Sequence, residues 1–297
     1  MAQRVRTIFL VVGAAHGGTS IAVMLLGQHP DVFATGELTG FPDGQHFLDD
    51  NICGCGEPAK QCEFWSLVCN DCSAKAGSGS TPILDVYRSI FRRSQAAAIV
   101  DCAHDGARAF ELSELTKKEP DLKLVIVSVV RPVESVASSQ LRVALERNRI
   151  KDKAWPRLKR VSKAAVRRQK ILREVQPENL NCKVVIVNYA TLCDRPLDVL
   201  RPIWEEAEVE SMSAAQWLGG GSRSVHKPTH MIRGNRKLRS REKIELRRDL
   251  SASSLSGFEK LIVKAIANLP IERLVFAIKR IYRGLQQRSG ESRQASI

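Results

Sequence analysis

Residues 7–30 read TIFLVVGAAHGGTSIAVMLLGQHP, and this stretch decides the fold. It begins as an apolar run with several β-branched residues, passes through Gly13, Gly17 and Gly18, and continues with apolar residues at helical spacing. This pattern predicts a buried strand, a glycine-rich turn and a helix. Such a turn gathers backbone N–H groups at the positive end of a helix dipole, so it favours binding of a phosphate or sulfate group.

The glycine turn departs from an NTPase phosphate loop at one position. A Walker A loop reads G-x-x-x-x-G-K-[ST], whereas here Gly13 and Gly18 have that spacing but Thr19 and Ser20 follow. Without the lysine, the loop lacks the usual contact to the β- and γ-phosphates of ATP, which suits it to another anion. Taken alone, the loop is also compatible with a tight strand-to-helix connection that binds nothing.

Further apolar runs extend the strand and helix pattern along the chain. Strands are predicted at residues 98–102, 123–130 and 183–188, with a short strand that ends at Glu37. Helices are predicted at residues 82–97, 111–118, 133–149, 156–174 and 192–206. Continuous apolar strands separated by helices are typical of a parallel sheet covered on both faces, so the expected fold class is α/β.

Length and hydropathy bound the domain organisation. At 297 residues the chain can bury a large core, and we expect a single domain over residues 1–287 with a cysteine-rich insertion at about residues 49–80. Residues 288–297 are expected to form a disordered tail. No apolar run approaches the roughly 18 residues that a membrane-spanning helix needs, and we expect a cytoplasmic protein.

The chain is strongly basic. Its 46 Lys and Arg residues against 32 Asp and Glu residues give a net charge of +14, with the excess in residues 142–173 and 233–248. This balance indicates a polyanionic partner such as a nucleotide, a nucleic acid, an acidic polymer or an anionic membrane, or simply solvated helix faces. Two C-terminal amphipathic segments, residues 258–269 and 274–285, either pack on the domain or make a peripheral membrane contact.

Five cysteines lie in a short segment at positions 53, 55, 62, 69 and 72. Four thiolates would bind zinc, but the segment has no second regularly spaced C-x-x-C pair. A reducing cytoplasm also disfavours disulfides. We therefore interpret the segment as a thiol-bearing cap on the acceptor side and expect no metal.

Several motifs, in order along the chain, resemble the PAPS-dependent sulfotransferases of the bacterial type. They are the loop at 13–20, HPDV…GE at 29–37, C-x-C-G…C-x-F-W at 53–65, VDCAHD at 100–105, VSVVRPVESVASS at 127–139, Tyr189, and H-x-x-x-G-N at 230–235. The resemblance implies a P-loop-like α/β fold and 3′-phosphoadenosine 5′-phosphosulfate (PAPS) as co-substrate. It covers most of the chain.

The resemblance also implies a set of donor-binding residues. The 5′-phosphosulfate would be held at the loop, the 3′-phosphate by an arginine and a serine eight residues apart, and the adenine by a tyrosine. A glycine and an asparagine of the last motif would lie nearby. In this sequence these positions are Gly17, Gly18, Thr19, Ser20, Arg131, Ser139, Tyr189, Gly234 and Asn235.

Two residues are the candidates for catalysis. His16 lies in the loop, where a cation or N–H donor would stabilise the charge that grows on the bridging oxygen. Glu37 would accept the proton of the acceptor hydroxyl as it attacks sulfur. Asp101 and His104 are second candidates for the mouth of the site, although relatives have a serine and a lysine where Cys102 and His104 stand.

The predicted reaction is transfer of a sulfuryl group to a hydroxyl or amine of a small-molecule, glycan or lipid acceptor. One alternative is a degenerate P-loop kinase or NTPase, for which Asp101 would be a Mg²⁺ ligand. Another is a non-enzymatic basic protein that binds a polyanion or a membrane. No nucleic-acid partner is expected.

Overall fold

The computed structural model describes residues 5–39, 41, 51–74, 82–209, 224–226, 228–234, 243–246 and 254–268. The chain divides into two compact units, one formed by Met1–Arg131 and Ile171–Asp249, the other by Pro132–Lys170 and Leu250–Ile297. The expected single domain over residues 1–287 stays a prediction. The second C-terminal amphipathic segment and the tail at 288–297 lie outside the described residues.

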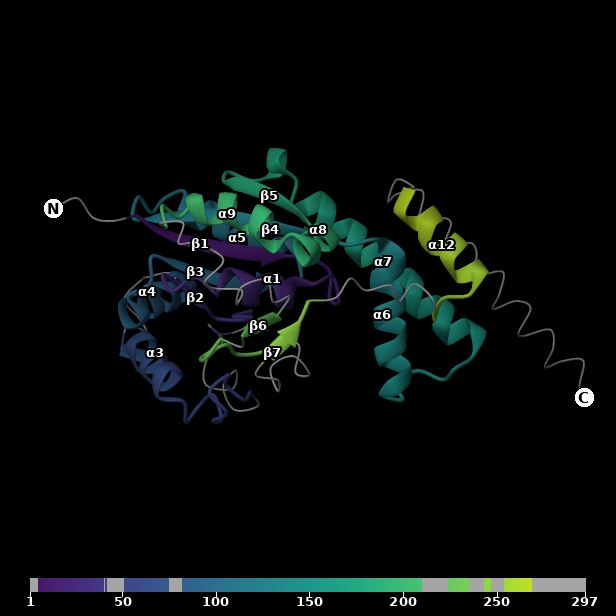
Figure 1. The fold of residues 1–297 in the computed structure, drawn as a ribbon, viewed down its shortest axis with the longest axis horizontal. Helices are drawn as coiled ribbons and strands as arrows, with labels where there is room; N and C mark the ends of the chain where they lie inside the picture. Colours follow the sequence, from purple (N-terminus) through teal and green to yellow (C-terminus); the bar gives the residue numbers. More distant parts are fainter. Residues whose placement is uncertain are drawn as a thin grey trace, which may run out of the picture. The chain divides into compact units, whose positions relative to one another are not determined.

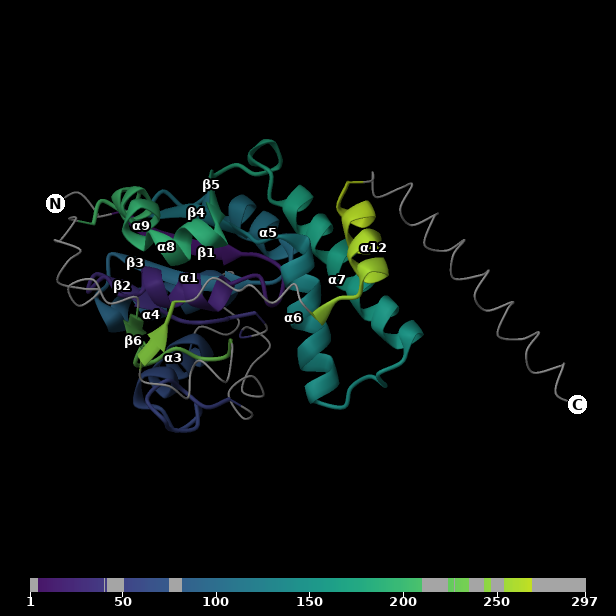
Figure 2. The same cartoon turned by 45° about the vertical axis from the view of Figure 1, so that its right-hand side comes forward.

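The larger unit contains the predicted parallel sheet, with strand order β2-β3-β1-β4-β5. Every neighbouring pair is parallel, and β1 lies between β3 and β4 (Figures 1 and 2). The strands are β1 (Arg6–Val12), β2 (Val32–Ala34), β3 (Ala98–Ala103), β4 (Leu122–Val130) and β5 (Lys183–Asn188). Because all five run in one direction, their carboxyl ends share one edge of the sheet, as the sequence predicts.

Helices cover both faces of this sheet. Alternate strand residues such as Phe9 and Val11 pack in one cluster with α1 and α9, including Trp204. The intervening residues face α4 and α5, since Asp101 of β3 accepts a hydrogen bond from Tyr87 of α4. The helices of this unit are α1 (Thr19–Leu26), α3 (Glu63–Ala74), α4 (Pro82–Ser94), α5 (Gly106–Thr116), α8 (Tyr189–Asp194) and α9 (Pro196–Glu205), with the 3₁₀ helix η2 (Pro177–Asn179).

Capping residues explain two differences between predicted and observed helices. α5 begins five residues earlier than predicted because the Asp105 carboxylate accepts from Arg108 N and caps its first turn. The predicted helix at 192–206 is two helices: Asn188 caps α8, and Pro196 occupies the first turn of α9 after a break at Arg195.

The cysteine-rich insertion includes a helix that the sequence analysis does not predict. It contains α3, whose Trp65 and Val68 are fully buried one helical turn apart. Cysteines, Asn70 and Asp71 interrupt the apolar pattern of this helix, so its periodicity is weak in the sequence. A short antiparallel pair, β6 (Ser224–His226) and β7 (Lys243–Glu245), completes the larger unit.

The smaller unit is helical. It contains α6 (Val133–Glu146), the first part of α7 (Ala154–Glu174) and α12 (Gly257–Asn268) around a core that includes Leu141 and Val161. Arg157 donates to Glu259 across 2.9 Å. α12 occupies most of the first predicted amphipathic segment. It buries Val263 and Ile266 but leaves Phe258 and Leu261 exposed, so the apolar residues of this segment do not all lie on one buried face.

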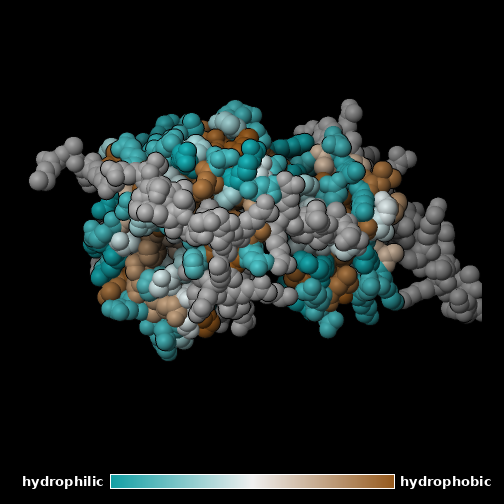
Figure 3. Space-filling model, viewed as in Figure 1, coloured by the Kyte–Doolittle hydropathy of each residue, from teal (hydrophilic) through white to brown (hydrophobic). Residues whose placement is uncertain are grey.

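Apolar side chains are distributed sparsely on the visible surface. On the face drawn in Figure 3, hydrophilic residues dominate the coloured area and hydrophobic residues form small separate groups. Among the described residues, no helix combines the length and the apolar character needed to cross a membrane.

Candidate active site

The glycine turn connects the end of β1 to the start of α1 and has two residues in the left-handed region. Gly18, the N-cap residue, has φ 103°, and His16 has φ 68°. Gly18 has no side chain with which to cap α1. The N–H groups in the first turn of a helix also have no intrahelical acceptor. The turn therefore has the form expected of an anion-binding loop.

Two loop residues, Gly17 and Thr19, make contacts within the protein, and their predicted contacts to a donor stay predictions. The Gly17 N–H donates to Ala14 O at 2.7 Å, so this amide shapes the turn and does not point to a ligand. The Thr19 side chain is 3% exposed and its hydroxyl hydrogen-bonds to Cys102. These findings leave the Thr19 backbone N–H, Gly18 and the partly exposed Ser20 as the loop groups that fit an anion.

Arg131 and Tyr189 lie against the loop. Arg131 follows β4 and donates from a guanidinium nitrogen to His16 O at 2.7 Å. Its guanidinium carbon lies 4.9 Å from the centroid of the Tyr189 ring, which begins α8 after β5. A Cβ on Gly18 would lie 2.1 Å from the Tyr189 ring, so only glycine permits this close approach. The structure thus brings together His16, Gly18, Arg131 and Tyr189.

Glu37 and His104 face each other beside the loop. Glu37 Oε2 lies 3.9 Å from His104 Nε2, and both side chains are about one-fifth exposed, at 22% and 21%. His104 Nδ1 lies 2.9 Å from Gly13 O, and because a carbonyl only accepts, Nδ1 carries the proton. Nε2 of the neutral ring is then an acceptor, and at 3.9 Å it makes no hydrogen bond to Glu37.

Residues 228–234, far from the glycine turn in sequence, contact the backbone at Glu37 and lie near the Ser20 side chain. Ile232 N donates to Thr35 O at 2.8 Å, and Glu37 N donates to Ile232 O at 3.1 Å. A Cβ on Gly234, which has φ 80°, would lie 3.4 Å from Ser20 Oγ. Gly234 is therefore beside the loop, as the resemblance implies. The predicted Asn235 lies outside the described residues.

Asp101 is a structural carboxylate, which corrects its prediction as a residue of the site mouth. It is 1% exposed. Its oxygens accept from Leu38 N at 2.9 Å, Cys102 N at 2.7 Å and the Tyr87 hydroxyl at 2.6 Å. A carboxylate with this many donors, away from solvent, has no free lone pair directed outward for Mg²⁺.

Ser139 belongs to the other unit. It lies in α6 and is 6% exposed, eight residues after Arg131, which ends the first segment of the larger unit. Its proposed contact to the donor stays a prediction.

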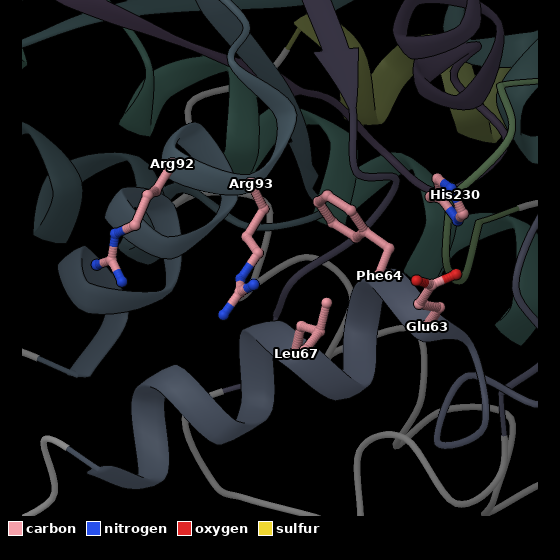
Figure 4. Close-up of a pocket in the computed structure, with 6 residues that line it drawn as sticks. All are labelled: Glu63, Phe64, Leu67, Arg92, Arg93 and His230. Atoms are coloured by element: carbon pink, nitrogen blue, oxygen red, sulfur yellow. The ribbon is translucent and has the colours of Figure 1, made fainter.

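A pocket of about 480 Å³ lies beside the cysteine-rich insertion, the segment interpreted from the sequence as a cap on the acceptor side (Figure 4). The contributions of α4 and His230 to this pocket were not predicted. α3 and α4 form two of its walls, and His230 lies at one end. Arg93 pairs with Asp71 at 2.7 Å, which fixes one wall. The lining residues are Glu63, Phe64, Leu67, Arg92, Arg93 and His230. The one signal in the sequence was the spacing of Glu63, Phe64 and Leu67 on one helix face.

Comparison with solved structures identifies the fold. No protein-family model and no curated protein sequence matches the chain. The chain is similar to the sulfotransferase domain of the Synechococcus PCC 7002 olefin synthase, with 15% identity and a TM-score of 0.54 over 90% of this chain and 97% of that one. Other matches are a sulfotransferase domain from the curacin biosynthetic pathway (18% identity, TM-score 0.44, 85% and 84% covered) and mouse sulfotransferase SULT7A1 complexed with PAP (11%, 0.49, 92% and 88%). The chain therefore has the sulfotransferase fold, a parallel sheet flanked by helices.

Proposed function

We propose that this protein transfers a sulfuryl group from PAPS to a hydroxyl or amine acceptor. The observation that carries the proposal is the meeting of three groups at one sheet edge: an anion loop without the NTPase lysine, the Arg131 guanidinium against that loop, and the Glu37 carboxylate beside His104. Each group has a separate task in sulfuryl transfer.

The donor would bind by its two charged ends. The uncapped first turn of α1 offers N–H groups and a positive dipole to the 5′-phosphosulfate. Arg131 donates to His16 O beside the loop, and a planar guanidinium is well suited to charge-assisted hydrogen bonds with a phosphate. In this proposal Arg131 binds the 3′-phosphate and Tyr189 presents its ring to the adenine, while the contact of Ser139 stays a prediction from the sequence.

The chemical step needs a base on the acceptor side and positive charge on the leaving side. Glu37 takes the proton from the acceptor hydroxyl while its oxygen forms the new bond to sulfur. The bond from sulfur to the bridging oxygen breaks in line, and 3′,5′-adenosine bisphosphate leaves with that electron pair. His16 and the first turn of α1 stabilise the negative charge that grows on the bridging oxygen.

His104 holds the geometry of the base in this scheme. Its Nδ1–H donates to Gly13 O, at the first loop residue after β1, and its Nε2 faces Glu37. The imidazole therefore links the donor loop to the base.

The acceptor is proposed to approach from the side of the cysteine-rich insertion. The pocket between α3 and α4 is lined by His230, and Ile232 of the same segment pairs with Glu37. Its aromatic floor at Phe64 and its arginines suit an acceptor with an apolar body and a polar or anionic group. A small molecule, a glycan or a lipid fits this description.

The kinase or NTPase alternative is less well supported. It requires a carboxylate at the end of a strand to hold Mg²⁺, and Asp101 is enclosed by Leu38 N, Cys102 N and the Tyr87 hydroxyl. It also requires the loop lysine, where this chain has Thr19.

Turnover measurements test the proposal. The purified chain is incubated with PAPS and a panel of hydroxyl and amine acceptors without added Mg²⁺, and release of 3′,5′-adenosine bisphosphate is measured, with ATP as the matched alternative. We expect acceptor-dependent release from PAPS and no ATP hydrolysis. Mg²⁺-dependent turnover of ATP, with none of PAPS, would contradict the proposal.

A further inference from the structure

We propose that Cys53, Cys55, Cys62 and His230 bind one structural zinc ion. These four residues, called the Cys₃His cluster below, offer three thiol sulfurs and one imidazole nitrogen. Such a ligand set is one of those that zinc uses in structural sites. The sequence groups only the three cysteine ligands, because His230 lies 168 residues beyond Cys62.

The distances in the cluster fit a tetrahedral site. Cys62 Sγ lies 3.4 Å and Cys53 Sγ lies 3.8 Å from His230 Nδ1, and all four ligand atoms lie within 4.8 Å of one another. Zinc bonds of about 2.3 Å to sulfur and about 2.0 Å to nitrogen give tetrahedral edges of roughly 3.6–3.8 Å. The widest separation therefore needs to shorten by only about 1 Å to meet that geometry.

A tight turn places the three sulfurs on one side. Cys53 N donates to Glu57 O at 2.8 Å and Gly56 N donates to Cys53 O at 3.0 Å, which closes the turn around Cys55. Gly56 has φ 104°, a conformation that a residue with a side chain rarely adopts. Cys62 then follows at the entry to α3, where Cys62 N donates to Pro58 O.

The segment that carries His230 is held directly against this turn. Gly54 N donates to Met231 O at 2.8 Å, and a Cβ on Gly54 would lie 2.4 Å from Pro228 O. The indole of Trp65 donates to His230 O at 2.7 Å. These contacts join two parts of the chain that are far apart in sequence and present the imidazole to the thiols.

The orientation of the imidazole agrees with a ligand role. Its Nδ1 faces the thiols, and its ring stacks on Phe64 with centroids 5.2 Å apart and an angle of 19°. Figure 4 shows the Glu63 carboxylate on the same side of the pocket as the His230 ring. Metal-bound histidines commonly have a carboxylate near the other ring nitrogen, which fixes the ring and raises its basicity.

The site would be closed and structural. Four protein ligands fill a tetrahedral zinc and leave no position for substrate, and sulfuryl transfer itself needs no metal. All eight cysteines of the chain are free thiols, so the cluster is not occupied by a disulfide. Bound zinc would fasten the turn at residues 53–62 to residues 228–234, the segment that pairs with Glu37 and places Gly234 near Ser20.

Metal content tests the proposal independently of any enzymatic activity. The full chain without a histidine tag is purified under reducing conditions and analysed by elemental mass spectrometry. We expect about one zinc per chain in wild type, and at least a tenfold lower content in Cys62→Ser and His230→Ala. Cys69→Ser and Cys182→Ser, which change partly buried cysteines outside the cluster, should keep it. Wild type with less than a tenth of an equivalent, or equal zinc in ligand and control variants, would overturn the proposal.

A second measurement covers ligand variants that fail to fold. Zinc is removed from wild type with a chelator, and the thermal unfolding midpoint is measured before removal, after removal, and after addition of Zn²⁺ or Mg²⁺. We expect the midpoint to fall and to recover with Zn²⁺ only, and Co²⁺ in place of zinc should give the intense visible absorption of a tetrahedral thiolate site. A midpoint that is indifferent to zinc, or Co²⁺ bound without thiolate charge-transfer bands, would contradict the proposal.

Discussion

Asp101 lies in β3, and Glu37 lies three residues beyond the end of the neighbouring strand β2, yet their carboxylates have different surroundings. Asp101 is 1% exposed and accepts from two backbone N–H groups and the Tyr87 hydroxyl. The Glu37 side chain is 22% exposed and faces His104. Position near the carboxyl edge of a sheet is therefore insufficient to identify a candidate catalytic base. What separates the two is whether the oxygens are already saturated by donors.

Among variants of the two carboxylates and their partners, Glu37→Gln should have the largest effect, and that effect should be on activity. The amide is nearly isosteric but does not accept a proton, so we expect sulfuryl transfer to fall by about 10²–10⁴-fold, the usual contribution of a general base. Turnover at saturating PAPS measures the change, and the thermal midpoint should stay close to that of wild type. Full activity in Glu37→Gln would remove Glu37 from the mechanism.

Asp101→Asn should have its main effect on stability. The amide presents N–H groups where the carboxylate accepts from Leu38 N, Cys102 N or Tyr87, so a buried donor loses its partner. We expect a loss of at least about 2 kcal/mol in the free energy of unfolding. Urea denaturation measures it, and a change below about 0.5 kcal/mol, as for a surface substitution, would contradict the structural role.

Tyr87→Phe gives a smaller effect on the same network. It removes one 2.6 Å hydrogen bond to Asp101 and leaves the ring in place. We expect a destabilisation of about 1 kcal/mol. In the double variant with Asp101→Asn, the loss in the free energy of unfolding should be smaller than the sum of the losses in the two single variants, because the residues share one interaction. Strict additivity in urea denaturation would show that they are not coupled.

The pH dependence of stability provides the finest test. Burial raises the pKa of Asp101, although the charge of Arg108 and the hydrogen bond from Tyr87 act in the opposite direction. A carboxyl with a raised pKa binds more protons when folded, so its contribution is fully present below the unfolded pKa and is lost as pH rises through the folded pKa. We expect the stability advantage of wild type over Asp101→Asn to be larger at about pH 4 than at about pH 7. An advantage that grows with pH would contradict this direction.

Strands with continuous β-branched runs were predictable from the sequence. β5 has the predicted bounds, Lys183–Asn188, and β4 begins one residue before the predicted position. The end of β4 also located Arg131 at the edge of the sheet. The short strand predicted to end at Glu37 instead ends at Ala34, three residues earlier. The break between α8 and α9 has a signal in Pro196, whereas α3 has almost none, because polar residues and cysteines interrupt its buried face.

The part of the site that could not be predicted from the sequence consists of contacts between segments far apart in the chain. Nothing near Asp101 in the sequence shows that Tyr87 and Leu38 N donate to its oxygens. The sequence therefore presents Asp101, like Glu37, as a candidate residue of the site. Likewise, no local pattern joins His230 to Cys53 and Cys62. Burial and partner choice at these positions depend on tertiary packing, which a pattern along one chain does not contain.

Calorimetric titration with 3′,5′-adenosine bisphosphate tests the proposed donor site at the glycine turn and Arg131 most directly. We expect wild type to bind the bisphosphate and to bind ATP at least tenfold more weakly, since one charge-assisted contact contributes about 1.5–3 kcal/mol. Arg131→Ala should lose most of the bisphosphate affinity, while Arg195→Ala, which changes a 70% exposed arginine of the same unit, should bind as wild type does. Equal affinity for ATP and the bisphosphate, unchanged in Arg131→Ala, would contradict the account.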